Sequence, residues 1–246
     1  MLPTRDNCDP GNPSEAFLWM FVGMPDDLHL PMSYFRHVSQ RFWDLGARPV
    51  EEPVKVLVPP GEMQQSAVNP GYWERIDGQE PEDRPKSSIT GIPTRQSCNL
   101  SNPEEAFLWM FVALPYVRGG AMILSEAAYR RDSEHLWDLG ARPVEEPTLE
   151  YVPSSMAQPD WATSAGKWVP VGTFSAQERE RLEVESSIAR LHLNQKAELY
   201  AALEAWESGR ELPDTKAGLV VRNMLNSEPQ LVPLALTVLR ELHDAA

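Results

Sequence analysis

The chain has 246 residues, of which 42% are apolar and 24% charged, which is typical of a folded globular protein with one large domain or a few small ones. Its 36 acidic and 22 basic residues give a net charge of −14, which argues against binding to a nucleic-acid backbone. No apolar run reaches the length of a membrane span, and the N-terminus lacks a signal-peptide pattern. We therefore expect neither a nucleic-acid nor a membrane partner.

The most informative feature of the sequence is an internal repeat. The octapeptide EAFLWMFV occurs at residues 15–22 and again at 105–112, and the residues on both sides of it align without a gap. After a variable stretch that is four residues longer in the second copy, the segment WDLGARPVEEP recurs at 43–53 and 137–147. Such a repeat predicts a tandem duplication of one small module.

The octapeptide predicts a short buried helix in each copy. It follows an Asn-Pro pair at Asn12 and Asn102, and an Asn cap, a Pro at the first helical position and acids in the first turn are typical of a helix start. Pro25 and Pro115 predict its end. Because the run is apolar on all sides, we expect it to be buried. The predicted core of the repeats comprises Phe17, Leu18, Trp19, Trp43, Phe107, Leu108, Trp109 and Trp137.

A second helix and two strands are predicted to complete each copy. The helices run from about residue 31 to 45 and from about 125 to 139, and each ends at a glycine suited to a left-handed cap, Gly46 or Gly140. Strand propensity follows in both copies, at 54–58 and around Trp73 in the first, and at 149–152 and around Trp168 in the second. The predicted fold class is α+β, with a duplicated helix-helix-strand-strand module.

The copies are joined by a charged, proline-rich linker and followed by a helical segment. The linker is long enough for the copies to meet about a pseudo-twofold axis. In the last segment, Ser175 and Glu178 have the form of a capping box, Asp214 can cap a later helix, and Asn194 could start a fresh one. We predict three helices there. The predicted domains are 1–76 (first copy), 77–93 (linker), 94–173 (second copy) and 174–246 (helical).

No motif in the sequence indicates a catalytic, cofactor or metal site. The histidines and the two cysteines have no metal-ligand spacing and no nucleophile signature. Cys8 and Cys98 occupy matching places in the repeat; a disulfide is conceivable, but two buried thiols are favoured. We interpret Arg48 and Arg142 as members of structural ion pairs, for example with Asp44 and Asp138.

Adjacent acidic pairs in the repeat raise the question of acid/base chemistry. Glu51 and Glu52, like Glu145 and Glu146, would point to opposite faces of a strand, so the two carboxylates of a pair cannot share one site. An enzyme or ligand-binding protein with a site between the copies is kept as an alternative. The leading expectation is a protein without enzymatic activity and without a cofactor.

The second copy and the tail resemble a known protein family. The residues NPEEAFLWMFVALP, HLWDLGARPVEEPTLEYVP, WATSAGKWVPVG and LYAALEAWESGRELPDTKAGLVVRNML resemble a family encoded among the virion structural genes of tailed phages of actinobacteria, over roughly residues 94–246. One such unit with a tail is the ordinary arrangement in that family. The family carries no known catalytic residues.

The resemblance implies a virion protein that binds other structural subunits. The implied role is a minor capsid or capsid-decorating protein, with the major capsid protein or another virion subunit as partner. A head-to-tail connector or an assembly factor is the alternative, and homo-oligomerisation is left open. We expect partner contacts in the unshared parts, at 26–33, 116–125, the linker and the helical tail.

Overall fold

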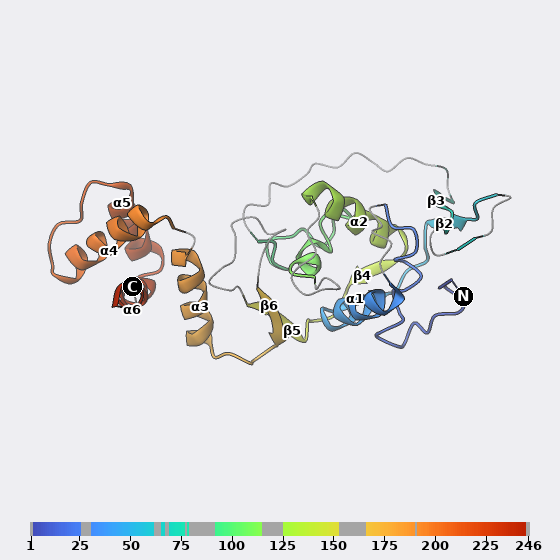
Figure 1. The fold of residues 1–246 in the computed structure, drawn as a ribbon, viewed down its shortest axis with the longest axis horizontal. Coiled ribbons are helices and arrows are strands. Elements are labelled where there is room, and N and C mark those ends of the chain that lie inside the picture. Colours follow the sequence, from blue (N-terminus) through green and yellow to red (C-terminus); the bar gives the residue numbers. More distant parts are fainter. Residues whose placement is uncertain are drawn as a thin grey trace. The chain divides into compact units, whose positions relative to one another are not determined.

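The computed structural model confirms the α+β fold class, with helices and small two-stranded sheets (Figure 1). It describes residues 2–25, 31–61, 65–66, 69–76, 78, 92–114, 125–152, 166–189 and 191–244. The described chain forms two compact units, which divide between Glu150 and Tyr151. Unit 1 holds both octapeptides, and unit 2 holds the helical segment.

The two predicted longer helices of the repeats are present. They are α1, Met32–Asp44, and α2, Glu126–Asp138. Each ends as predicted at a glycine with positive φ, +86° at Gly46 and +89° at Gly140, where an L side chain would be strained. Leu45 and Leu139, which come just before these glycines, are fully buried. The two helices therefore stop at a turn that only glycine adopts readily.

The octapeptides do not form the predicted α-helix. The first copy is a succession of turns, and the second contains only a short 3-10 helix, η1, Leu108–Phe111. The cause is a buried serine hydroxyl. Ser39 Oγ accepts a hydrogen bond from Phe17 N (3.2 Å) and donates one to Pro13 O (2.7 Å), the two groups that an α-helix would join directly.

In the second copy a serine hydroxyl likewise replaces a direct backbone hydrogen bond of an α-helix. Ser133 Oγ accepts from Phe107 N (3.2 Å) and donates to Pro103 O (2.6 Å). Both serines are fully buried and come from the following helix, α1 or α2. Each hydroxyl thus takes the place of one i to i−4 hydrogen bond in the octapeptide segment. It also attaches that segment to α1 or α2. The sequence analysis missed this residue, although it is a serine at matching positions of both variable stretches.

The octapeptides form the core of unit 1. From Ala16 to Val22 and from Ala106 to Val112, no residue is more than 8% exposed. Phe42 of α1 lies against Phe107 and Phe111 of the second copy, with ring centroids 6.0 and 5.3 Å apart. The aromatic core is therefore continuous between the copies. Of the other predicted core residues, Trp43 and Trp137 are only half-buried.

Six short strands form three two-stranded sheets among the described residues. They are β1 (Ala47–Pro49), β2 (Lys55–Val58), β3 (Tyr72–Arg75), β4 (Ala141–Pro143), β5 (Leu149–Val152) and β6 (Lys167–Pro170). β2 pairs with β3, and β5 with β6, at the predicted strand positions. The pairing of β1 with β4 was not predicted and joins the two copies.

The helical segment contains four described helices rather than the predicted three. They are α3 (Ala176–Ala189), α4 (Leu193–Glu207), α5 (Lys216–Ser227) and α6 (Leu231–Asp244). The capping box of Ser175 and Glu178 is present. A fresh helix, α4, begins one residue before Asn194, where the sequence allowed one, and His192 N at its start donates to Gln195 Oε1 (2.9 Å). α5 is capped by Thr215 instead of Asp214.

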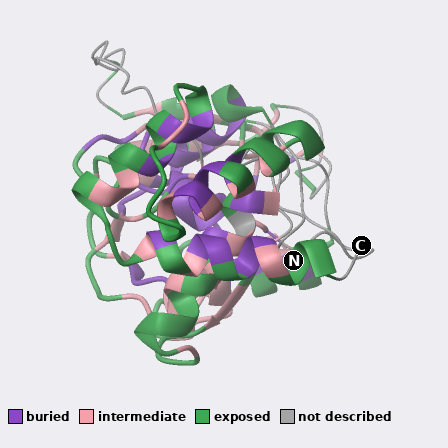
Figure 2. Ribbon diagram, turned by 90° about the vertical axis from the view of Figure 1, so that its left-hand side faces the viewer, coloured by how far each residue is buried: buried purple, intermediate pink, exposed green. Residues whose placement is uncertain are grey.

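The four helices enclose a separate apolar core. Figure 2 shows the buried residues on the sides of these helices that face one another. The core is built from branched aliphatic side chains and alanines of all four helices, among them Ile188, Leu203, Val221 and Leu236. Unit 2 thus has its own hydrophobic core, as an independent domain requires.

Truncation of either octapeptide tryptophan should destabilise unit 1. Trp19 is 8% and Trp109 2% exposed, so Trp19→Ala and Trp109→Ala should each lower the free energy of unfolding by about 3–5 kcal/mol in chemical denaturation. Tyr72→Ala is the control, because Tyr72 is 58% exposed and its loss should cost little. A fully stable Trp109→Ala protein would show that the octapeptide is not a core element.

Candidate functional site

The two copies meet at a contact with local twofold symmetry. In the antiparallel pair of β1 and β4, Arg48 lies opposite Arg142, Ala47 opposite Pro143, and Pro49 opposite Ala141. The two arginines hold the same position in their copies, and the pairs on either side of them are exchanged by a half-turn. A local twofold axis therefore passes between Arg48 and Arg142. The repeat therefore meets itself in the isologous way that is usual in homodimers.

Each arginine of this contact joins its own copy to the other. The Arg48 guanidinium lies over the Trp43 ring, 3.8 Å from the centroid, and its Nη1 donates to the carbonyl oxygens of Trp43 (2.7 Å) and Ala47 (2.6 Å). Its Nη2 forms an ion pair with Glu145 of the second copy. The stacking and the fixed carbonyl contacts favour arginine over lysine here.

Arg142 repeats this arrangement with the roles of the copies exchanged. It lies 3.7 Å from the centroid of Trp137, donates to the carbonyls of Trp137 and Ala141, and forms an ion pair with Glu51 of the first copy. Burial lowers the pKa of the Arg142 guanidinium, and the charge of Glu51 opposes that shift.

The ion-pair partners differ from the predicted Asp44 and Asp138, which lie in the same copy as the arginines. Each arginine side chain crosses the β1–β4 pair instead, because that pair brings Glu145 within reach of Arg48 and Glu51 within reach of Arg142. The neighbouring glutamates have other partners: Glu52 pairs with Arg5, and Glu146 with Arg95. Adjacent carboxylates therefore do not share a site.

The helix-ending glycines also take part in the contact. The carbonyl of Gly46 accepts hydrogen bonds from the backbone N–H groups of Val144 and Glu145 (both 3.0 Å), and that of Gly140 accepts from Val50 (3.0 Å) and Glu51 (3.1 Å). A Cβ atom on Gly46 would lie 2.1 Å from the carbonyl oxygen of Glu145. Gly140 has the same relation to Glu51. These glycines are needed both for positive φ and for the close approach of the copies.

The two aspartates of the repeated segment show where the symmetry ends. Their backbone carbonyls are equivalent, since Asp44 accepts from Thr148 N and Asp138 from Val54 N, both at 2.7 Å. Their side chains are not equivalent. Asp138 is buried and pairs with Lys55 (2.7 Å) and Arg75 (3.2 Å) of the first copy, whereas Asp44 accepts a hydrogen bond from Gln40 (2.9 Å).

A buried histidine makes a second asymmetric contact between the copies. His135 is 1% exposed and its Nε2 lies 3.0 Å from the carbonyl oxygen of Met20, so this nitrogen carries the proton. Its ring contacts Trp73 edge-on at 5.4 Å. The counterpart in α1 is Arg41, which reaches the carbonyl of Ala113 at 3.4 Å. Burial, with a smaller effect from Lys55, lowers the pKa of His135 from 6.5 to about 3.

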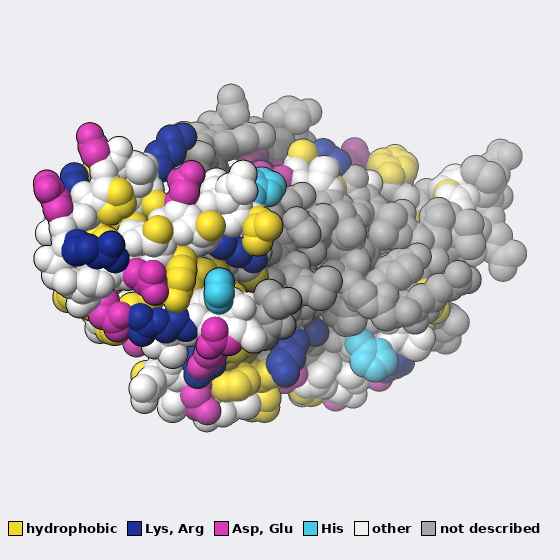
Figure 3. All heavy atoms as spheres, turned by 60° about the vertical axis from the view of Figure 1, so that its left-hand side comes forward, with side chains coloured by type: hydrophobic (Ala, Val, Ile, Leu, Met, Phe, Trp, Pro, Cys, Tyr) yellow, Lys and Arg dark blue, Asp and Glu magenta, His cyan; other side chains and the backbone are white. Residues whose placement is uncertain are grey.

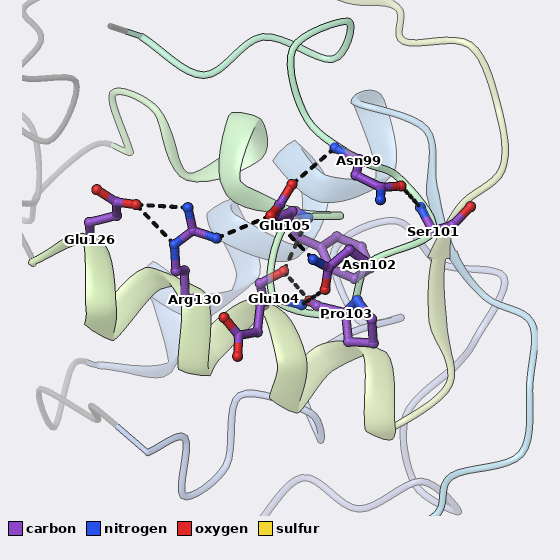
Figure 4. Close-up of polar contacts among 10 residues, drawn as sticks. Asn99, Ser101, Asn102, Pro103, Glu104, Glu105, Glu126 and Arg130 are labelled. Atoms are coloured by element: carbon purple, nitrogen blue, oxygen red, sulfur yellow. Dashed lines mark hydrogen bonds and ion pairs between the residues drawn. The ribbon is translucent and has the colours of Figure 1, made fainter. Parts of the chain in front are cut away.

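The glutamate that begins the octapeptide forms an ion pair in both copies. Glu15 pairs with Arg36 at 2.7 Å, near the surface. Its counterpart Glu105 is fully buried, 3.4 Å from Arg130, which also holds Glu126 at 2.8 Å. Figure 4 shows Arg130 between the two carboxylates.

Two asparagines complete the surroundings of the buried Glu105. Asn99 N donates to Oε2 (3.3 Å), and Asn102 Nδ2 donates to Oε1 (3.2 Å). Asn102 Oδ1 also accepts from Glu104 N at 3.2 Å, a local side-chain contact that begins a series of turns and not the predicted α-helix. The carboxylate therefore serves to hold the chain around the octapeptide.

Comparison with known proteins assigns the chain to a family. The sequence profile of the Phage gene 29 protein family matches residues 1–89 and 91–219, which is most of the chain. The chain belongs to the Phage gene 29 protein family. Comparisons with curated proteins and with solved structures found no significant match. The expectation of a phage protein family is thus confirmed.

In this member of the Phage gene 29 protein family, the two cysteines are free thiols at equivalent places. Cys8 is half-buried and Cys98 is buried. Burial raises the pKa of the Cys8 thiol and raises that of Cys98 to about 11. Because the thiolate is the nucleophile and the metal ligand, both groups are poorly suited to either chemistry at neutral pH.

In the described part of this Phage gene 29 family chain, no three His, Cys, Asp or Glu side chains are arranged to hold a metal ion. No helix of the described residues is long and apolar enough to cross a bilayer. The predicted partner contacts at 26–30, 116–124 and most of the linker lie outside the described residues.

Replacement of the glycines at the contact should destabilise this member of the Phage gene 29 protein family. Gly46→Ala and Gly140→Ala should each lower the free energy of unfolding by about 2–5 kcal/mol, because φ strain adds to a collision with the other copy. Gly61→Ala is the matched control: its φ is +65°, but a Cβ would meet no atom within 4 Å, so only about 1–2 kcal/mol is expected. Equal losses at all three positions would show that the close approach has no energetic role.

The buried His135 should make stability fall in acid. Because its pKa is lowered in the folded state, folding favours the neutral ring; this stability is complete above pH 6.5 and is lost as the pH falls toward 3. Relative to His135→Gln, the wild-type free energy of unfolding should fall by up to about 1.4 kcal/mol per pH unit across this window. Urea denaturation at several pH values measures the difference. Parallel pH profiles of the two proteins would contradict the burial of a neutral histidine.

Proposed function

We propose that this phage protein is an accessory structural subunit of the virion, which binds other structural subunits and above all the major capsid protein. Membership of a phage protein family supports a role in the phage life cycle. The observation that carries the proposal is that the arginines found in both copies make structural contacts. Arg48 and Arg142 direct their donors to carbonyl groups and to glutamates of the other copy, which makes the repeats one continuous scaffold.

The alternative of an enzyme or ligand site between the copies has weaker support. The residues that would line such a site are Arg48, Asp44, Arg142 and Asp138. The two arginines are engaged in the contact itself, Asp138 is neutralised by Lys55 and Arg75, and Asp44 is bonded to Gln40. The aromatic core also continues from one copy to the other. These side chains are better explained as a structural joint than as catalytic groups.

The surface chemistry agrees with a protein partner. Figure 3 shows Lys and Arg, Asp and Glu, and apolar side chains mixed on the described face of the helical unit. The net charge of −14 favours partners with basic surfaces through electrostatic steering. A chain that carries two compact units can also engage two sites at once and gain from effective concentration.

Particles made with and without this chain test the proposal. A phage deleted for this gene is complemented with the tagged wild-type chain, and purified particles are analysed by quantitative mass spectrometry and cross-linking. We expect the chain in the particles, cross-linked to the major capsid protein. Cross-links to connector subunits would move its position to the head-to-tail junction. Absence from mature particles, with presence on assembly intermediates, would instead indicate an assembly factor and would refute the virion role.

A further inference from the structure

The β2–β3 ribbon of unit 1 carries an exposed apolar stripe. The cross-strand pairs Val56 with Glu74 and Val58 with Tyr72 place these residues on one face, and Ile76 N continues the pairing by donating to Val54 O (2.8 Å). Four apolar side chains of this face are widely exposed, Val54 37%, Val56 50%, Tyr72 58% and Ile76 66%, and Val58 is half-buried. We call the face formed by Val54, Val56, Val58, Tyr72, Glu74 and Ile76 the apolar stripe.

The opposite face of the ribbon is attached to unit 1, which fixes the direction of the stripe. Trp73 donates from Nε1 to the carbonyl of Val22 (2.7 Å), and its ring lies near those of Trp19 (6.3 Å) and His135. Lys55 and Arg75 hold Asp138. The ribbon therefore cannot turn over to bury the stripe without losing these contacts.

The second copy provides an internal comparison for the stripe. Its equivalent hairpin, β5–β6, has Thr148 in place of Val54, Glu150 in place of Val56 and Lys167 in place of Tyr72. The other three positions, Val58, Glu74 and Ile76, correspond to the apolar residues Val152, Val169 and Val171. The module thus forms this hairpin with polar or charged residues at three positions where the stripe has exposed apolar side chains, those of Val54, Val56 and Tyr72. Val54, Val56 and Tyr72 are therefore not required to build the hairpin, and their exposed apolar side chains call for another explanation.

We propose that the apolar stripe is the docking surface for a phage structural subunit whose contact face is apolar and places a Lys or Arg opposite Glu74. The inference deepens the proposed function and rests on it. Large exposed apolar residues on one face are typical of protein interfaces. Glu74 is exposed in the middle of the stripe, so a basic partner group would complement it.

A second copy of this chain is a poorer occupant for electrostatic reasons. Self-association through the stripe would bring together two chains that each carry a net charge of −14, and it would place the Glu74 carboxylates of both chains in one contact without a basic partner from the stripe. A basic-rimmed subunit gains from the same charges. Charge complementarity therefore selects a heterologous partner.

Residues borrowed from the second copy give the test variant, and urea denaturation measures how far a second glutamate opposite Glu74 lowers its stability. Val56→Glu with Tyr72→Lys introduces the residues that the β5–β6 hairpin carries, and Glu74→Lys reverses the charge of the stripe. Leu219→Glu is the control, because Leu219 is a 51% exposed apolar residue of α5, away from the stripe in sequence and in unit 2. Circular dichroism and urea denaturation verify that all variants are folded.

Binding to particles lacking this chain is then measured by co-sedimentation. We expect the Val56→Glu/Tyr72→Lys variant to bind at least about tenfold more weakly than wild type and Glu74→Lys to be weakened as well, with Leu219→Glu unchanged. Equal binding of wild type and the double variant would overturn the docking surface and leave the proposed function standing. Sedimentation equilibrium of the free chain should show a monomer; a dimer that the double variant abolishes would overturn the heterologous partner.

A separate measurement distinguishes failure of the stripe from failure of the proposed function. If the wild-type chain does not bind particles, the proposed function fails, and the stripe is tested by a photo-crosslinking phenylalanine at position 72 in infected cells. An adduct with an identified phage structural subunit, absent with the same probe at position 219, supports the docking surface. No adduct above the control would overturn it.

Discussion

The fold of unit 1 depends on the contact in which the repeat meets itself at β1 and β4. Two glycines with positive φ let the chains approach closely, and two arginines lie over their tryptophans and reach across to glutamates of the other copy. Every interaction of this contact occurs twice, once from each copy. A single copy has no partner for its short strand or for its arginine, and the second copy supplies both. This requirement explains why the segment WDLGARPVEEP is identical in the two copies.

The contacts around this joint are less symmetric, and they distinguish the two copies. Asp138 is neutralised by two basic side chains of the β2–β3 ribbon, while the ion pair of Glu105 and Arg130 is buried where that of Glu15 and Arg36 is partly exposed. His135 is held neutral at a place where the other helix has Arg41. The two copies thus share the joint and differ in the residues around it.

Several features could be read from the sequence because they depend on local rules. The ends of α1 and α2 follow from Gly46 and Gly140, and the β2 and β5 strands follow from the strand propensity of their Val and Tyr residues. The octapeptide shows the limit of such reasoning. Its burial agrees with its apolar character, but its backbone is decided by Ser39 and Ser133, which lie far along the chain and replace a helical hydrogen bond. No local propensity contains that information.

The amino-acid sequence alone was enough to identify the repeated module, its apolar core and its helix ends, since identity, periodicity and glycine placement are local properties. It also indicated a phage family, to which the chain belongs. Only the tertiary structure decided which carboxylates the arginines bind, that β1 pairs with β4, and that the stripe of Val56 and Tyr72 is exposed. These features join residues that are distant in the chain, and their partners are selected by three-dimensional proximity and burial.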